Sequence, residues 1–179
     1  MALRRRAASL RKGMDRGIMH VGGTVHRLRV YIDTSVLGAV FDEEFSDATT
    51  AFFQQASEGK FDIVLSALVE DEIADAPQAV RDHHDGVLAH AETVTPSREA
   101  VLLQQAYLDA GVVGRKWADD ALHVATATVS ECDMIVSWNF RHIVHYDKKR
   151  KYNAVNTLRG YNSIDILTPA EVIEYEEEV

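Results

Sequence analysis

The chain has 179 residues, of which 46% are hydrophobic, so it fits one domain with one core, and its single Cys132 excludes an internal disulfide and a cysteine-based zinc site. No apolar run approaches the roughly 20 residues that span a bilayer, and no apolar stretch follows the N-terminal arginines, so we expect a cytoplasmic protein that does not enter membranes. The net charge of -9 repels nucleic acid at long range, so a polyanionic substrate would have to be met by a local basic patch or by bound cations.

Residues 1–28 are expected to be a disordered basic leader. They show no helical or strand period, contain several glycines, and carry mainly arginines among their charged residues. A basic arm that contacts nucleic acid or a partner is one interpretation; an inert tail or a start assigned too far upstream is the alternative. The domain is expected over residues 29–170, with an acidic C-terminal tail at 171–179.

Short apolar runs alternate with helical patterns from residue 28 onward. In chain order they predict a strand at 28–32, helices over 36–41 and 46–58, a strand at 61–65, helices over 66–75, 77–91, 97–110 and 121–130, a strand at 134–137, a basic helix or loop, a strand at 164–167 and a helix from residue 169. This alternation is typical of a single α/β domain, with a parallel sheet and helices on both faces.

Polar side chains follow three of the predicted strands. Asp33 follows the first strand, Ser66 ends the second, and Ser137 ends the third. Because open parallel sheets bind ligands outside the carboxyl ends of their strands, these residues are the first candidates for a site. Glu72, on the helix after Ser66, and Asp120, at the start of a later helix, add two carboxylates.

The three acids Asp33, Glu72 and Asp120 would repel one another if they converged. Two ionised carboxylates about 4 Å apart repel by about 4 kcal/mol at an effective dielectric constant of about 20. Such a cluster would have to be protonated, paired with lysine or filled by a metal ion. No lysine or arginine is adjacent in sequence to any of the three acids, and oxygen ligands suit Mg²⁺ or Mn²⁺. Taken singly, however, Asp33 is more typical of a turn or helix cap, and Glu72 of a solvated helix.

Four segments together resemble, in order and spacing, the four sequence blocks of PIN-domain ribonucleases, and most closely those of VapC-type bacterial toxins. They are VYIDTSVL at 30–37, LSALVEDEI at 65–73, WADDALHVATA at 117–127 and DMIVSWNFRHI at 133–143. Each block alone is a weak pattern, but four in order are fairly specific. The resemblance covers residues 28–170.

The resemblance implies a PIN-like α/β fold with an acidic site that uses one or two Mg²⁺ or Mn²⁺ ions to hydrolyse single-stranded RNA. It places Asp33, Glu72 and Asp120 as catalytic metal ligands. Asn139 is the fourth residue that the resemblance places in the catalytic site. It falls where many members have a fourth aspartate, which puts a second ion in question. A metal-bound water would attack the phosphorus in line. The small hydroxyl residues expected to line this site are Thr34, Ser35, Ser66 and Ser137.

RNA binding is expected from the basic cluster of the body, which follows Asn139 in the sequence, with a tryptophan that stacks on bases. A solvated loop and a buried tryptophan are the alternative. His123 is expected to be structural. For a VapC-type toxin the resemblance also implies a small antitoxin partner and a homodimer. The residues expected to bind RNA are Trp138, Arg141, Lys148, Lys149, Arg150 and Lys151.

Other enzyme classes fit the sequence less well. Haloacid-dehalogenase-type enzymes need a second aspartate two residues after the first, where this chain has Ser35. A receiver domain needs an acidic pair and a later lysine that are not evident, and no Gly-rich phosphate loop is present. The remaining alternative is a non-catalytic PIN-like module that binds RNA or a protein, with Asn139 as a sign of lost activity.

Overall fold

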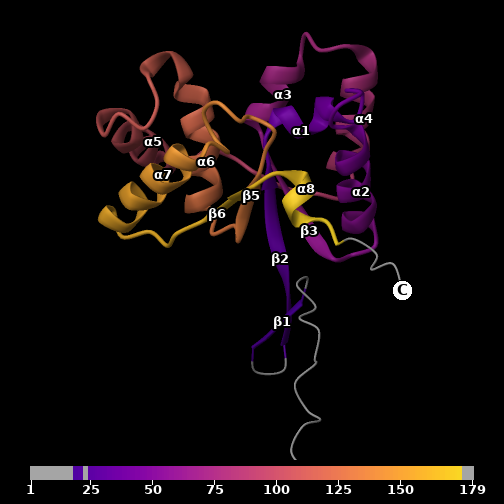
Figure 1. Cartoon of the computed structure of the whole chain (residues 1–179), viewed down its shortest axis with the longest axis horizontal. Helices are drawn as coiled ribbons and strands as arrows, with labels where there is room; N and C mark the ends of the chain where they lie inside the picture. Colours follow the sequence, from indigo (N-terminus) through magenta and orange to yellow (C-terminus); the bar gives the residue numbers. More distant parts are fainter. Residues whose placement is uncertain (1–17, 22–23, 175–179) are drawn as a thin grey trace, which may run out of the picture.

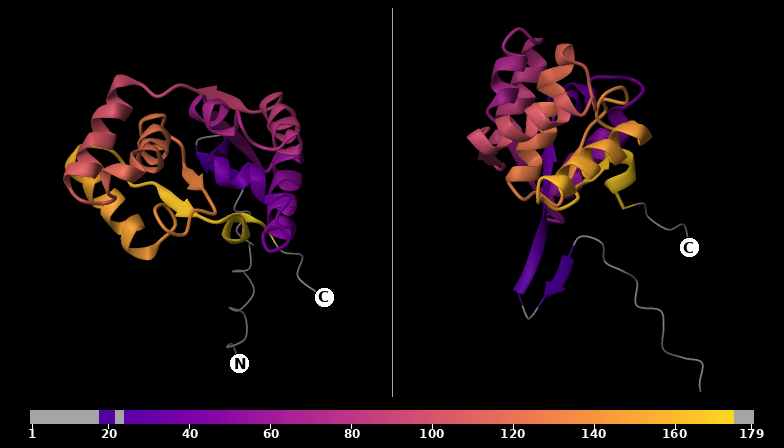
Figure 2. Two further views of the ribbon diagram at one scale, coloured as in Figure 1. Left: turned by 90° about the horizontal axis from the view of Figure 1, so that it is seen from above. Right: turned by 90° about the vertical axis from the view of Figure 1, so that its left-hand side faces the viewer.

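A computed structural model describes residues 18–21 and 24–174, which form a central sheet covered by helices on both faces (Figures 1 and 2). Five strands are parallel, in the order β4-β3-β2-β5-β6. This arrangement confirms the predicted α/β class. The strands of the sheet are β2 (Thr24–Ile32), β3 (Phe61–Ser66), β4 (Glu92–Val94), β5 (Met134–Val136) and β6 (Asp165–Leu167), and β1 (Ile18–Val21) pairs antiparallel with the first part of β2.

The helices lie in two groups, one on each face of the sheet. Among them α5, α6 and α7 cover one face, and α1, α2, α4 and α8 the other (Figure 2). Their bounds are α1 (Thr34–Ala39), α2 (Ser46–Ser57), α3 (Leu68–Ile73), α4 (Gln78–Leu88), α5 (Arg98–Asp109), the 3₁₀ helix η1 (Arg115–Trp117), α6 (Ala118–Val129), α7 (Tyr146–Leu158) and α8 (Pro169–Val172).

The two faces of the sheet have separate hydrophobic cores because side chains alternate along each strand. In β2, Val30 and Ile32 pack with α1 and α2, whereas Tyr31 between them packs with α5 and α6. In β5, Met134 and Val136 belong to the first core and Ile135 to the second. Burial on both faces explains why the central strands read as continuous apolar runs.

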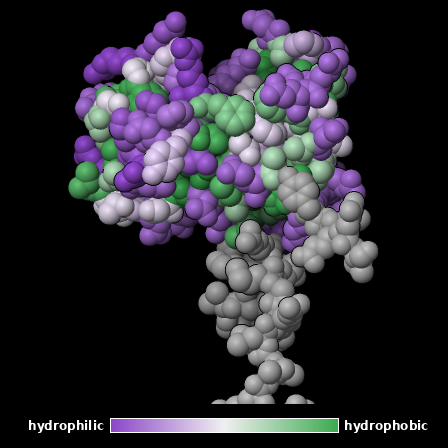
Figure 3. Space-filling view, viewed as in Figure 1, coloured by the Kyte–Doolittle hydropathy of each residue, from purple (hydrophilic) through white to green (hydrophobic). Residues whose placement is uncertain are grey.

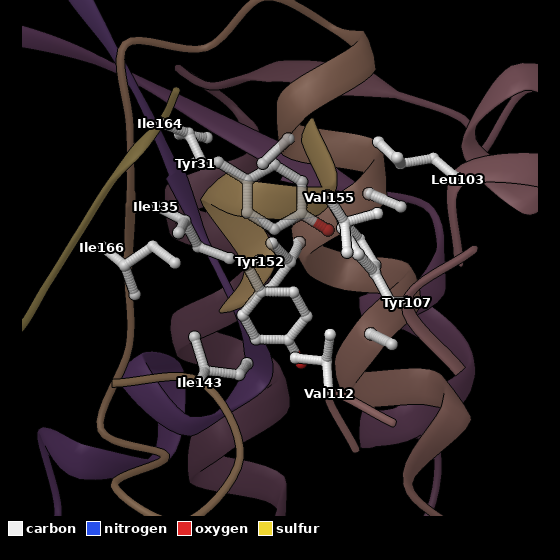
Figure 4. Close-up of a cluster of buried hydrophobic side chains, with 14 of the residues drawn as sticks. Tyr31, Leu103, Tyr107, Val112, Ile135, Ile143, Tyr152, Val155, Ile164 and Ile166 are labelled. Carbon is white, nitrogen blue, oxygen red and sulfur yellow. The ribbon is translucent and has the colours of Figure 1, made fainter. Parts of the chain in front are cut away.

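Buried tyrosines tie the helices of the α5–α7 face together (Figure 4). The rings of Tyr107 and Tyr152 meet edge to face, with centroids 4.8 Å apart. The Tyr107 hydroxyl donates to the side chain of Asn156, and the Tyr152 hydroxyl donates to the His142 carbonyl at 3.1 Å. This last bond anchors the loop after β5 to α7.

Two short segments differ from the predicted elements. Residues 18–21 and 24–28, which were expected in the disordered leader, form β1 and the first part of β2. The β1–β2 ribbon projects from the body (Figure 1), and its backbone pairing requires no hydrophobic period that a sequence would reveal. The edge strand β4 was missed because its sequence, Glu-Thr-Val, forms no apolar run, since its first two residues are exposed. The remaining leader residues and residues 175–179 of the predicted acidic tail lie outside the described residues.

Within the described ranges, no helix combines the length and the apolar character that crossing a bilayer requires.

Replacement of Ile135 by alanine tests the core on the α5–α7 face. Ile135 has no exposed surface, so we expect Ile135→Ala to lower the free energy of unfolding by about 2–5 kcal/mol. Leu158→Ala is the control, because Leu158 is 84% exposed and its truncation should change stability by no more than about 0.5 kcal/mol. Urea unfolding followed by circular dichroism measures both. Equal losses would contradict the assignment of this core.

Candidate active site

The predicted site residues gather where β2 and β5 end side by side. The backbone N–H of Asp33 donates to the Val136 carbonyl at 3.4 Å, and that of Ser137 donates to the Leu167 carbonyl at 3.0 Å. Figure 3 shows a notch in the molecule at this edge of the sheet, between the α3–α4 side and the α5–α6 side. Asp33 and Ser137, which directly follow β2 and β5, lie buried at this edge of the sheet.

Asp33 is the most deeply buried acid of the site, at 5% exposure. Its two carboxylate oxygens accept hydrogen bonds from the hydroxyls of Ser35 (2.5 Å) and Ser137 (2.8 Å). Each hydroxyl in turn accepts a backbone N–H, Ser35 from Trp138 and Ser137 from Asn139, both at 2.9 Å. Asp33 occupies the N-cap position of α1, but its side chain makes no capping bond. The Asp33 carboxylate therefore accepts hydrogen bonds from Ser35 and Ser137 instead of capping α1.

Glu72 reaches the site from α3 and is held by a histidine. Its Oε1 lies 3.1 Å from His123 Nε2, and its Oε2 accepts a hydrogen bond from the Thr34 hydroxyl. On the other side of the ring, His123 Nδ1 lies 2.7 Å from the hydroxyl of the fully buried Tyr31. A continuous line of hydrogen bonds thus connects the core to the Glu72 carboxylate.

Asp120, in the first turn of α6, is held in a similar way by a second histidine. Its Oδ2 lies 3.0 Å from His142 Nδ1, and its Oδ1 accepts a hydrogen bond from Asn139 Nδ2 at 2.8 Å. Asn139 also accepts the His142 backbone N–H at 3.0 Å, which fixes the loop that carries both residues. The His142 ring stacks on Trp117, with centroids 4.1 Å apart.

The Glu72 carboxylate acts electrostatically on both Asp33 and Asp120. Burial raises the pKa of Asp33 against the charge of His123, and the charge of Glu72 adds to the rise. Burial also raises the pKa of Asp120, although the charge of His142 opposes it. Glu72 again adds to this rise. For Glu72 itself, the hydrogen bond and charge of His123 outweigh burial, so its pKa is lowered. The structure therefore brings together the three acids that the sequence singled out.

Histidines and hydroxyls, rather than lysine or arginine, compensate this negative cluster. Burial would lower the pKa of His123, but its hydrogen bond to Glu72 and the nearby carboxylates outweigh burial and raise it. A proton, a lysine or a metal ion is therefore not the only way to compensate the acids, because His123 pairs with Glu72 and His142 with Asp120. No set of three or more His, Cys, Asp or Glu side chains in the described part of the chain is placed to share one metal ion.

The other predicted site residues have varied surroundings. Thr34, Ser35 and Ser137 contact the acids directly. Ser66 is buried, and its hydroxyl accepts the Leu68 backbone N–H at 3.2 Å, so it shapes the start of α3. Trp138 is only partly exposed; its Nε1 donates to the Thr49 hydroxyl at 2.9 Å.

The predicted basic cluster lies mainly on α7, and its cations contact groups of α7, of α8 and of the segment after α5. Lys149 lies 3.9 Å from Glu171, and Lys151 lies 2.7 Å from Asp147. Lys148 donates to a backbone carbonyl, and Arg150 lies over the Tyr146 ring. Arg141, in the loop after β5, instead lies 6.0 Å from the centre of the Trp117 ring.

Three residues that contact the acids or their partners are not among the predicted site residues: His123, His142 and Trp117. His123 follows Asp120 by three residues, which places both on one face of α6, and this spacing was the available signal. The pairing of His142 with Asp120, across a loop, has no local signal.

An acid at position 139 tests how Asp120 is held. In Asn139→Asp the donor to Asp120 Oδ1 is replaced by a second negative charge. We expect a loss of about 1–3 kcal/mol in the free energy of unfolding at neutral pH without added metal. The control is Asn162→Asp, which makes the same chemical change at an exposed position with no side-chain hydrogen bond. Urea denaturation would contradict this account if the two variants lost the same stability.

Comparison with known proteins finds only distant structural likenesses. No protein-family model and no curated protein matches the chain. A chain in the crystal structure of VapBC2 from Rickettsia felis, bound to a DNA fragment from their promoter, is similar at a TM-score of 0.49 and 14% identity. The match covers 64% of this chain and 90% of that chain. A likeness at this level assigns neither a family nor an activity.

Proposed function

We propose that this protein is a divalent-metal-dependent endoribonuclease that cleaves single-stranded RNA in the notch at the carboxyl edge of its sheet. The observation that carries this proposal is the convergence of three acids from three separate elements. The charge of Glu72 reaches both Asp33 and Asp120 and raises the pKa of each. Carboxylates with perturbed pKa values in a depression are typical of functional sites.

The donor chemistry of the site fits a hard cation. Mg²⁺ keeps several waters and is commonly held by one or two carboxylates, so it does not need a closed cage of protein ligands. Glu72, with its side chain one third exposed, is the most accessible of the three acids. It would hold the ion with one of the other two, Asp33 or Asp120, because the three are not placed to share one ion. A bound Mg²⁺ or Mn²⁺ would supply an activated water and neutralise charge on the phosphate.

Neighbouring residues would orient the acids, and one histidine–carboxylate pair would accept and return the proton of the reaction. Ser35 and Ser137 fix both oxygens of Asp33, and His123 fixes Glu72 against the core. Asp120 and His142 lie 3.0 Å apart, so a proton can pass between them. In the proposed reaction the pair would accept the proton of the attacking water and give one to the departing oxygen. Water would then be the nucleophile, and no covalent intermediate with the protein is needed.

A role as the toxin of a type II toxin–antitoxin pair is a narrower part of the proposal. It rests on the resemblance of the four sequence blocks to VapC-type toxins. It would bring a small antitoxin that covers the notch, and a homodimer. A short reading frame for a DNA-binding protein next to this gene, whose product co-purifies with the chain, would support this role.

A non-catalytic module that binds RNA or protein is the second candidate. It is favoured by the hydrogen-bonded state of the acids, since hydroxyls, an amide and two histidines already satisfy them. Asn139 in place of a fourth acid agrees with it. Binding without cleavage would distinguish this module from the enzyme.

The proposal is tested with a mixed pool of single-stranded RNA, purified protein free of any bound inhibitor, and Mn²⁺. We expect cleavage that stops in EDTA, and a fall of about 100-fold or more in Asp33→Asn, which keeps the shape of the side chain but removes its charge. Asp62→Asn, at an exposed aspartate of β3, is the matched control and should cleave like the unchanged protein.

Two outcomes would count against the enzyme. RNA that is bound but stays intact with Mn²⁺ would favour the binding module. Equal cleavage by the Asp33 and Asp62 variants would show that the notch is not the active site.

A further inference from the structure

An exposed aromatic ring lies beside the acidic cluster, and the proposed reaction does not use it. Trp117 ends η1 and is 36% exposed. One part of its ring stacks on His142, at 4.1 Å between centroids and 30° between planes. His142 Nδ1 in turn lies 3.0 Å from Asp120. The imidazole ring of His142 therefore lies between Trp117 and Asp120.

Two cations lie against this ring. The Lys116 ammonium is 5.1 Å from the centre of the Trp117 ring, and the Arg141 guanidinium is 6.0 Å away. In the described part of the chain, neither makes an ion pair with an acid, whereas Lys149 and Lys151 of α7 both do. The net charge of the whole chain is -9, so free positive charge next to the acidic notch is the kind of local patch that a polyanion needs.

We propose that Trp117, flanked by Lys116 and Arg141, is a stacking platform that holds a base of single-stranded RNA beside the acidic notch. This inference rests on the proposed function and adds the subsite that holds the strand. Single-stranded nucleic acids are bound by aromatic rings that stack on bases together with cations that follow the phosphates. Trp117 and its two neighbours supply both parts.

The platform can accept a base without rearrangement of the fold. A base stacked on an aromatic ring is held more strongly than an exposed cation is held over the same ring. The incoming base would therefore displace a long side chain, Lys116 or Arg141, from the ring. The displaced cation would then lie close to a phosphate of the same strand.

Trp138, which the sequence suggested for stacking, is less suited to this role. Its Nε1 donates to Thr49, and its ring lies 4.5 Å from that of Phe45. These contacts make Trp138 part of an aromatic cluster that supports the loop, whereas Trp117 keeps a third of its surface open.

Binding is measured by fluorescence anisotropy with a fluorescein-labelled single-stranded RNA of about 12 nucleotides, in EDTA so that the strand stays intact. We expect Trp117→Ala to weaken binding about 10- to 100-fold, and Trp117→Phe, which keeps a stacking ring, to retain most of the affinity. Lys116→Ala combined with Arg141→Ala should reduce the salt dependence of binding by about 1.4 logarithmic units per tenfold salt, the value for two single-strand phosphate contacts.

The matched control is Tyr146→Ala. Tyr146 is also an exposed aromatic residue with a cation over its ring, since Arg150 lies 5.5 Å from its centre, but it begins α7 and contacts none of the acids. We expect RNA binding of this variant to be unchanged. The chain has two tryptophans, so the tryptophan fluorescence of Trp138→Phe comes from Trp117 alone. We expect RNA binding to quench this fluorescence.

The outcomes separate this inference from the proposed function. Unchanged RNA affinity in Trp117→Ala, with cleavage by the parent protein intact, would overturn the platform alone and leave the ring as a surface for a protein partner. An equal loss in Tyr146→Ala would also overturn it. If Trp117→Ala weakens RNA binding but the parent protein does not cleave RNA with Mn²⁺, the proposed nuclease activity is wrong and the stacking platform is supported. A parent protein that neither binds nor cleaves RNA would overturn both.

Discussion

The burial of the Asp33 carboxylate at the end of the central strand is the constraint around which this edge of the protein is built. A carboxylate taken out of water must regain its hydrogen bonds from the protein. Ser35 and Ser137 provide them, and both hydroxyls are oriented by backbone N–H groups of the loop after β5. The loop therefore cannot move without disturbing Asp33. In this way one buried charge ties the end of β2 to the segment that carries Asn139.

Helix α6 and the β5–α7 loop extend this arrangement to the other acids. Asp120 and His123 are three residues apart on α6, and each faces a different partner, His142 and Glu72. The core supports both ends of the network, since Tyr31 holds His123 and Tyr152 holds the His142 carbonyl. The site is thus positioned by the packed centre of the molecule rather than by its surface.

Most of the fold could be predicted because its signals are local. The alternation of Val30, Tyr31 and Ile32 between two cores produces a continuous apolar run, and the change from such runs to helical periods marks the layers. β4 was not predicted because it lies at the sheet edge with two of its three residues exposed, so it leaves no apolar run. The β1–β2 ribbon was not predicted because it pairs outside the packed body. The three acids were found through strand ends and through the resemblance to the PIN-domain blocks. Their histidine partners were not, because contacts such as that between Glu72 and His123 join elements that only the folded chain brings together.

The shortness of the strands has its own consequence. β5 has three residues, each adding about 3.3 Å, so the span from Asp133 before it to Ser137 after it is only about 13 Å. The Asp133 side chain accepts the Arg29 backbone N–H at 2.7 Å, just before the point where β2 begins to pair with β5. Because β5 is so short, local unfolding of this strand would disturb the contacts of Asp133 and of Ser137 at the same time. Slow hydrogen–deuterium exchange at the amides of β5 would therefore report on the intactness of the acidic notch itself.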